Sequence, residues 1–230
     1  RRTGDPKYRP LEELLSCDFL TLHTPLEKGG PDPTWHLANA ELLARMNPGA
    51  VLLNASRGAV ADGRALLAAL ESGSLGGAVL DVWEGEPTPD LRLLARVDLA
   101  TPHIAGYSYD GKVNGTEMIY RAACAHLGVE PRWDRAACMP APEIAELPLE
   151  AARRPEEEVL REAALRLYPI ERDDASLRRV ADQPADKRGV YFDRLRKDYP
   201  VRREFQNTRL RVAGGTPALE RKLRGIGFTL

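Results

Sequence analysis

The sequence predicts an α/β fold in which the first half of the chain forms part of a doubly wound parallel sheet, and two observations support this. Four short apolar runs have the length of buried strands: 18–22, 50–54, 77–82 and 98–101. Segments with helical signals lie between the first three, and the clearest runs from its cap at Asp62 to Gly73 with Leu66, Leu67 and Leu70 on one side. Strands that alternate with helices in this way are typical of parallel sheets.

The second half of the chain predicts a different organisation. A long helix is expected at 109–127, followed by a linker in which prolines recur from Pro131 to Pro155. Further helices are expected at 156–168, 175–181, 187–199 and 217–224, with one strand at 203–212. We therefore predict three parts: residues 1–107 as the C-terminal part of a Rossmann-type domain, 108–150 as a return helix and Pro-rich linker, and 151–230 as a small α+β domain.

The composition favours an enzyme that acts on small molecules. The chain has 230 residues, 43% of them hydrophobic, so a sizeable core can form. Its net charge of −1 implies no general attraction to nucleic acid or to a membrane surface. Cys17, Cys124 and Cys138 form no CxxC motif and predict reduced core thiols in a cytoplasmic protein, with neither a disulfide nor a metal site.

Three polar motifs follow three of the predicted strands. They are NASRG at 54–58, DVWEGEP at 81–87 and TPHIAG at 101–106. They bring Arg57, Glu86 and His103 to strand ends, where open α/β sheets bind their ligands. An arginine can bind a carboxylate through two parallel hydrogen bonds, and a histidine beside a glutamate can transfer a proton at neutral pH. This set suits the oxidation of a 2-hydroxy acid by a nicotinamide cofactor.

The order of these motifs resembles that of the D-isomer-specific 2-hydroxyacid dehydrogenases. The resemblance extends from about Tyr8 to the C-terminus. The run from Gly106 to Tyr120 and the run from Phe192 to Phe205 are similar to one subfamily, whose substrate is a phosphorylated 2-hydroxy acid. The resemblance implies NAD as the cofactor, a cytoplasmic location, and a homodimer formed through a C-terminal dimerisation domain at 151–230.

The resemblance also implies roles for individual residues. His103 is the acid/base that takes the C2 hydroxyl proton, Glu86 orients its ring, and Arg57 binds the substrate carboxylate. Residues at cofactor-binding positions are Thr24, Ala55, Ser56, Arg57, Asp81 and Gly106, with Asp81 bonding to the nicotinamide carboxamide; substrate-binding positions are Arg57 and Tyr107. We expect Glu84 to be a surface carboxylate and His36 to be non-catalytic.

One expected motif is missing, and two other functions stay open. A nicotinamide-binding domain normally begins with a Gly-rich turn, and no GxGxxG occurs in this sequence. We therefore expect the C-terminal part of a longer enzyme, inactive by itself, whose preference for NAD over NADP the sequence leaves open. The alternatives are a phosphoglycerate or hydroxypyruvate type of dehydrogenase, and a dinucleotide-sensing protein similar to a corepressor.

The apolar content of the last 80 residues also favours a dimer. We expect that a unit formed by 151–230 cannot bury all of its apolar helix residues: Leu160, Leu165, Leu167, Tyr191, Leu195 and Tyr199. An exposed apolar face that pairs with its own copy would make this segment sufficient for a two-fold dimer.

Overall fold

The computed structural model describes residues 8–230 and divides the chain into two compact units. Of the described residues, the first unit contains 8–105 and 171–198. The second contains residues 106–170 and 199–230. This division differs from the expected domains, because residues 171–198 belong to the first unit and not to the C-terminal one.

The first unit is built on a parallel sheet of four strands, as the sequence predicts. The strands lie in the order β1 (Phe19–Leu22), β2 (Val51–Asn54), β3 (Gly77–Leu80) and β4 (Leu99–Ala100). Leu52 and Ala78 pair in register on the two central strands and are fully buried. Such a sheet has a single carboxyl edge, and the polar motifs follow β2, β3 and β4 at that edge.

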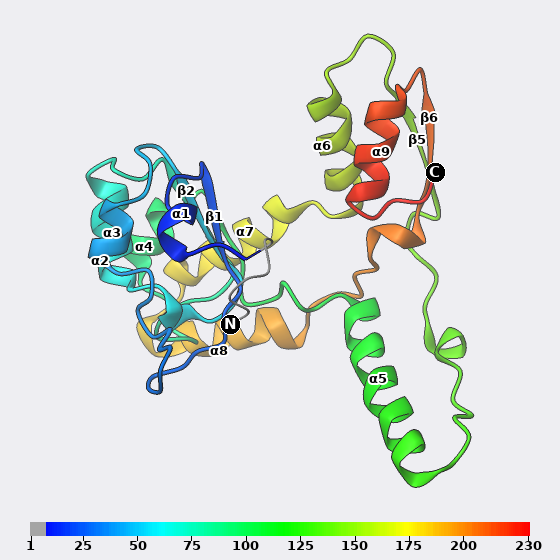
Figure 1. Ribbon diagram of the computed structural model, residues 1–230, viewed down its shortest axis with the longest axis horizontal. Coiled ribbons are helices and arrows are strands. Elements are labelled where there is room, and N and C mark those ends of the chain that lie inside the picture. The colour runs from blue at the N-terminus through cyan, green and yellow to red at the C-terminus, as the bar shows by residue number, and fades with distance from the viewer. Residues whose placement is uncertain (1–7) are drawn as a thin grey trace. The chain divides into compact units, whose positions relative to one another are not determined.

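The short helix α1 (Leu11–Leu14) precedes β1, and three further helices connect the strands: α2 (Ala40–Ala44), α3 (Gly63–Glu71) and α4 (Leu91–Arg96). Asn39, Asp62 and Asp90 cap α2, α3 and α4 with side-chain oxygens that accept backbone N–H groups. Figure 1 shows these three helices beside one another. The sequence does not predict α4, because the prolines before it suggest a loop and the helix has only six residues.

Residues 171–198 pack against β4 and α4 through specific polar contacts. They contain most of α7 (Ile170–Arg178) and all of α8 (Arg188–Lys197). The Asp174 carboxylate accepts the edge N–H of Ala100 at 2.8 Å. The Arg178 guanidinium donates to the carbonyls of Leu94 and Val97 at the end of α4, at 2.7 and 2.9 Å. These contacts complete groups that a strand edge and a helix end leave unsatisfied.

This packing corrects the apolar argument for dimerisation. Phe192 is fully buried in the first unit's core, and Tyr191 and Leu195 pack against the same core. Leu160 and Leu167 pack against the core of the second unit. The segment 151–230 is therefore not one structural unit, and most of the side chains expected on an exposed face are already covered.

The second unit contains two parallel strands covered by two helices. Figure 1 shows α6 (Glu156–Leu167) and α9 (Pro217–Gly225) side by side against β5 (Glu146–Glu150) and β6 (Arg209–Ala213). β5 lies where the sequence predicts a linker. The linker is predicted because Pro148, in the middle of this segment, disfavours a strand. β5 pairs with β6 alone, so a proline whose nitrogen lies on the other edge of the strand fits without the loss of a ladder hydrogen bond.

The helix α5 (Tyr109–Leu127) has the bounds that the sequence predicts. The Ser108 hydroxyl caps its start, and Gly128, with φ of 67°, ends it. Among the cysteines, Cys124 is buried on this helix, whereas Cys17 and Cys138 are exposed and free, so the expectation of core thiols is wrong for these two. Within residues 8–230, none of the helices combines the length and the hydropathy needed to cross a membrane.

Candidate active site

Arg57 lies in a tight turn that the buried Asn54 organises. The Asn54 side chain donates to the Arg57 carbonyl at 3.1 Å and accepts the Ser56 N–H at 3.1 Å and the Ser56 hydroxyl at 2.9 Å. The Arg57 side chain is exposed, and its Nη1 donates to the Ser56 carbonyl at 2.6 Å. Within residues 8–230 it forms no ion pair. Most of its guanidinium donors are therefore available for an incoming carboxylate.

The loop that carries His103 is held by Asp81, which directly follows β3. The buried Asp81 carboxylate accepts the Thr101 hydroxyl at 2.6 Å and the N–H groups of Ile104 and Ala105 at 2.8 and 3.0 Å. The backbone N–H of His103 donates to the Asp81 carbonyl at 2.6 Å. His103 has a φ of 56°, a left-handed conformation that non-glycine residues adopt mainly where the surroundings impose it.

Glu86 and His103 form a hydrogen-bonded pair. Glu86 Oε2 lies 2.8 Å from His103 Nδ1, and Glu86 Oε1 accepts the backbone N–H of Trp83 at 2.7 Å. Because a carboxylate only accepts hydrogen bonds, Nδ1 is the donor and carries a proton. Nε2 is left without a hydrogen bond among the described residues, and the side chain is 30% exposed. The arrangement directs one nitrogen of a proton carrier toward solvent or a ligand.

The loops that carry Arg57 and Glu86 pack directly on each other. Trp83, which precedes Glu86, donates from its indole N–H to the Thr101 carbonyl at 3.0 Å. Gly58, which follows Arg57, lies so close to Trp83 that a Cβ there would overlap the Trp83 carbonyl. The first unit thus brings Glu86 into contact with His103. It also packs the Arg57 turn against the loop that carries Trp83 and Glu86.

The predicted cofactor-binding residues differ in whether their polar atoms already have hydrogen-bond partners within the protein. Thr24, just beyond β1, has a buried hydroxyl that no described residue bonds. Ser56 is bonded to Asn54, and the three contacts of Asp81 already engage both of its oxygens. An unpaired buried hydroxyl at the carboxyl edge of a parallel sheet fits a dinucleotide's polar groups, so the residues present are compatible with such a cofactor.

The remaining predicted positions have unequal surroundings. Ala55 is exposed at the end of β2, and Gly106 is exposed in the second unit with open space where a Cβ would stand. Tyr107, also in the second unit, packs edge to face on Tyr199 with ring centroids 6.0 Å apart, and Lys112 Nζ lies 3.9 Å from its ring centroid. The ligand-binding roles of these residues and of Asp81 stay predictions.

Glu84 has two hydrogen-bond partners that its position in the sequence does not predict. Its Oε1 lies 2.6 Å from His36 Nε2, and its Oε2 accepts the Gly63 N–H at 3.1 Å. Glu84 is a surface carboxylate, as expected, with a side chain that is 38% exposed, but both of its oxygens have protein partners. No local signal reveals these contacts, because His36 is 48 residues away in sequence and Gly63 is 21 residues away.

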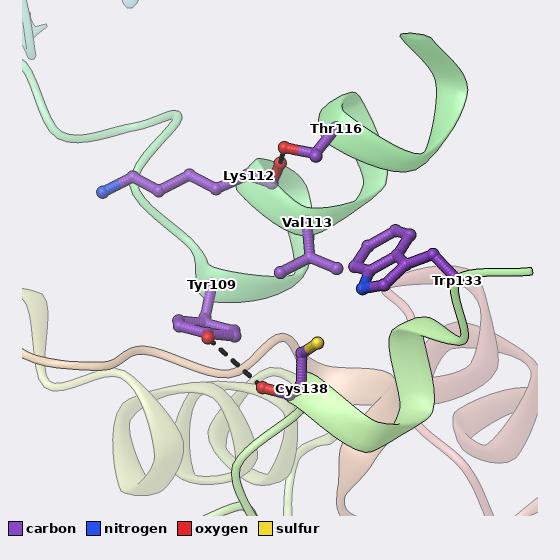
Figure 2. Close-up of a pocket in the computed structure, with 6 residues that line it drawn as sticks. All are labelled: Tyr109, Lys112, Val113, Thr116, Trp133 and Cys138. Atoms are coloured by element: carbon purple, nitrogen blue, oxygen red, sulfur yellow. Dashed lines mark hydrogen bonds between the residues drawn. The ribbon is translucent and has the colours of Figure 1, made fainter. Parts of the chain in front are cut away.

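A pocket of about 320 Å³ lies in the second unit, and none of the predicted site residues lines it (Figure 2). Its lining residues are Tyr109, Lys112, Val113, Thr116, Trp133 and Cys138. The Tyr109 hydroxyl donates to the Cys138 carbonyl at 3.2 Å beside it. The lining contains one cation and neither a carboxylate nor a histidine, so it lacks an acid/base pair.

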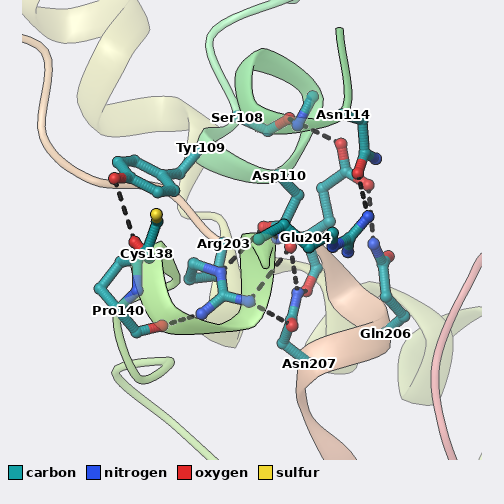
Figure 3. A network of polar contacts seen from close by, with 12 residues as sticks. Ser108, Tyr109, Asp110, Asn114, Cys138, Pro140, Arg203, Glu204, Gln206 and Asn207 are labelled. Carbon is teal, nitrogen blue, oxygen red and sulfur yellow. Dashed lines mark hydrogen bonds and ion pairs between the residues drawn. The ribbon is translucent and has the colours of Figure 1, made fainter. Parts of the chain in front are cut away.

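A buried polar network in the second unit joins α5 to the segment before β6 (Figure 3). The Asp110 carboxylate binds the Arg203 guanidinium through two contacts of 2.9 and 3.1 Å, and it accepts N–H groups of Glu204 and Asn207 at 3.0 Å each. Burial opposes ionisation of Asp110, but these hydrogen bonds outweigh it and lower its pKa below the ordinary value. Every charged atom of this pair faces a protein partner, which indicates a structural role.

Comparison with protein families matches two parts of the chain. Residues 2–105 match the D-isomer specific 2-hydroxyacid dehydrogenase, NAD binding domain. Residues 138–227 match a domain of unknown function, DUF3410.

Curated relatives match nearly the whole chain. The erythronate-4-phosphate dehydrogenase of Marinobacter nauticus is 43% identical over 224 residues, which are 97% of this chain and 58% of that protein. The enzyme of the same name from Salinibacter ruber is 50% identical over 203 residues, 86% of this chain and 51% of that protein. The chain thus spans between half and three fifths of the length of these relatives.

Solved structures match parts of the chain. The TT0316 protein from Thermus thermophilus is 40% identical over 56% of this chain and 42% of its own, with a TM-score of 0.46. A glyoxylate reductase from Paecilomyes thermophila is 31% identical over 54% of this chain and 38% of its own, with a TM-score of 0.44.

Proposed function

We propose that this chain, whose residues 2–105 match the NAD binding domain of the D-isomer specific 2-hydroxyacid dehydrogenases, takes part in the oxidation of 4-phospho-D-erythronate by NAD. The product is (R)-3-hydroxy-2-oxo-4-phosphooxybutanoate. The reaction is a step in the biosynthesis of pyridoxal 5'-phosphate (vitamin B6). The relatives from Marinobacter nauticus and Salinibacter ruber support this substrate. The observation that carries the chemistry is the Glu86–His103 pair, whose Nε2 has no partner among the described residues.

Each residue of the set has a defined task in this reaction. Bound NAD supplies the acceptor for the hydride that leaves C2. His103 Nε2 takes the proton of the C2 hydroxyl as the C2–O bond becomes a carbonyl. The Glu86 carboxylate stabilises the imidazolium that results, and it holds the ring with Nδ1 turned inward. The exposed Arg57 guanidinium binds the C1 carboxylate and fixes the orientation of C2.

The substrate-binding role of Tyr107 and the cofactor-binding roles of Thr24, Ala55, Ser56, Asp81 and Gly106 belong to the same proposal. The unpaired buried hydroxyl of Thr24 supports its role. For Asp81 the contacts support a second task, because its carboxylate also holds the backbone of the His103 loop. A nicotinamide carboxamide could share an Asp81 oxygen, since each carboxylate oxygen accepts more than one hydrogen bond.

We also infer a cytoplasmic homodimer. Exposed apolar side chains on α5 support association, since Met118, Ile119 and Leu127 are 72%, 74% and 70% exposed. The free exposed thiols of Cys17 and Cys138 are consistent with a reducing compartment. Sedimentation of the purified chain at several concentrations tests the dimer. A monomer at tens of micromolar, or a dimer unaffected by Ile119→Lys, would argue against pairing through α5.

Activity is best measured in two proteins, because the chain spans 58% of the Marinobacter nauticus relative. One is the chain itself, and the other is a chimera in which this chain replaces the matched part of that relative. We expect the chimera to reduce NAD with 4-phospho-D-erythronate and to prefer this substrate to D-3-phosphoglycerate and to D-glycerate. The unaltered relative is the control for the assay. A chimera that folds and binds NADH but prefers another acid would reject the substrate, and one that binds NADH without any turnover would favour a dinucleotide sensor.

A further inference from the structure

The loop that presents Glu86 is anchored at its tip by Glu84. The Glu84 carboxylate bridges two separate parts of the first unit, the His36 ring and the first N–H of α3 at Gly63. Glu86, two residues later, has its own oxygens on the Trp83 N–H and on His103. Two carboxylates of one short loop therefore have different partners. Glu84 binds His36 and the start of α3, whereas Glu86 binds His103.

His36 is itself firmly placed. Its backbone N–H donates to the Ala59 carbonyl at 2.8 Å, just beyond the Arg57 turn. Its ring stacks on Trp35 with centroids 3.8 Å apart, and its Nδ1 lies 3.7 Å from Asp62 Oδ2. Asp62 also caps α3, so both carboxylates that flank this ring are attached to the start of the same helix. The scaffold side of the Glu84 contact is thus rigid.

We propose that Glu84, held by His36 and Gly63, is a positioning residue that sets the orientation of Glu86 and therefore the protonated nitrogen of His103. The proposal rests on the proposed function, in which His103 Nε2 must be free to take a proton. Without Glu84, the loop loses its polar contacts with His36 and the start of α3. It keeps the Trp83 contacts near Thr101 and Gly58 at its start, the bond from the Trp83 N–H to Glu86, and the packing of Pro87 near Gly189. The Glu86 carboxylate then samples several orientations, and His103 loses the partner that holds its proton on Nδ1.

A metal site is the other use for a histidine and two carboxylates, and the geometry disfavours it. The three residues offer atoms within 4.8 Å of one another. However, Glu84 faces Nε2 and Asp62 faces Nδ1, so the two carboxylates lie on different ring nitrogens. One ion cannot be bound by one ring nitrogen and both carboxylates without a rearrangement. The arrangement is that of a hydrogen-bonded bridge.

The test is nitrogen NMR of the histidine rings in the intact 230-residue chain. The chain has four histidines, so single substitutions assign every ring signal. In the unaltered chain we expect the His103 proton on Nδ1, in slow exchange with water. In Glu84→Ala we expect a mixture of tautomers and about tenfold faster exchange of that proton, which corresponds to the loss of one charge-assisted hydrogen bond. Glu84→Gln keeps an acceptor for Gly63 and should restore much of the wild-type signal.

The controls separate positioning from general stability. Glu71→Ala removes an exposed carboxylate of α3 that pairs with Arg92, and it should leave the His103 signals unchanged. Backbone amides of β2 report whether each variant stays folded. If Glu84→Ala does not fold, His36→Ala removes the same anchor from the other side and should give the same change at His103.

Three outcomes would overturn the proposal. One is a folded Glu84→Ala or His36→Ala chain with unchanged His103 tautomer and exchange. Another is equimolar Zn²⁺ binding that shifts the His36 ring signals and leaves those of His103 alone. A third is an unaltered chain in which His103 carries its proton on Nε2, since no pair then exists to be positioned. The NMR result needs no turnover, so a failure of the proposed substrate in the activity assay remains a separate result.

Discussion

Two regions of this molecule use an arginine and carboxylates in opposite ways. In the second unit, Arg203 is bonded to Asp110, Asn207 and the Pro140 carbonyl, and its side chain is 11% exposed. In the first unit, Arg57 is exposed and bonds a single backbone carbonyl. The polar groups around Arg57 satisfy its backbone and leave its guanidinium open.

The difference shows how a structural ion pair and a binding site can be told apart. At Asp110, carboxylate and guanidinium satisfy each other, so no ligand is needed and none can enter without breaking the network. At the sheet edge, Asn54, Asp81 and Glu84 satisfy backbone groups and a neighbouring ring, while Arg57 and the Nε2 of His103 stay open. We therefore expect substitutions at the sheet edge to change activity and substitutions in the Asp110 network to change stability.

The largest effect is expected for His103→Phe, measured in the chimera. Phenylalanine keeps a ring of similar size but cannot take the C2 hydroxyl proton, so kcat should fall by about 10²–10⁴-fold. The affinity for NADH and the melting temperature should change little, because the ring is part-exposed and its side chain pairs with Glu86 alone among the described residues. Kinetics and NADH titration of the same preparation check both expectations. Activity within tenfold of the parent would remove His103 from the proton-transfer role.

Asp110→Asn should have the next largest effect, on stability and not on chemistry. Asn keeps the size of the side chain but leaves the mostly buried Arg203 guanidinium without its counter-charge, a change that typically costs about 3–5 kcal/mol. Hydrogen exchange at β6 should accelerate, whereas exchange at β2 in the other unit should not. A variant with unchanged exchange at β6 would show that Asn207 and Pro140 alone hold Arg203.

The Asp110 network also shows where sequence reasoning stops. The strands of the first sheet and the bounds of α5 could be predicted, because apolar runs and caps are local signals. Local signals also placed Arg57, Glu86 and His103 at strand ends, and the structure brings Glu86 to His103. Contacts such as Arg203 to Asp110, 93 residues apart, leave no local trace.

The same reason explains two features that the sequence does not predict. Residues 171–198 carry ordinary amphipathic helices, and only the contacts of Asp174 and Arg178 with the β4 edge and α4 attach them to the first unit. Glu84 has no feature that separates it from a solvated loop carboxylate until His36 and Gly63 are seen beside it. Partners distant in the chain decide both the domain membership of a helix and the role of a carboxylate.

A smaller effect is expected for Arg57→Lys in the chimera. Lysine keeps the positive charge but replaces a planar fork by a point charge, so carboxylate binding loses one of two parallel hydrogen bonds. We expect kcat/KM to fall by about tenfold or more, with contributions from both kcat and KM. The matched control is Arg203→Lys, which should alter hydrogen exchange at β6 and leave kcat/KM nearly unchanged. Unchanged kinetics in Arg57→Lys would mean that another cation binds the carboxylate.

The smallest effect is a pH dependence confined to the second unit. The pKa of Asp110 in the folded chain lies below its ordinary value of 3.8, because the hydrogen bonds from Arg203, Glu204 and Asn207 outweigh the opposing effect of burial. The unfolded chain therefore binds this proton more tightly, and ionised Asp110 stabilises the fold fully above the ordinary pKa. That stabilisation is lost as the pH falls below 3.8 and through the folded pKa. Hydrogen exchange at β6, corrected for the intrinsic rate, should thus accelerate on acidification in the unaltered chain and less so in Asp110→Asn. Equal acid sensitivity of the two proteins would assign the effect to other carboxylates, of which Glu117 and Glu156 also have lowered pKa values, through Arg121 and Lys222 respectively.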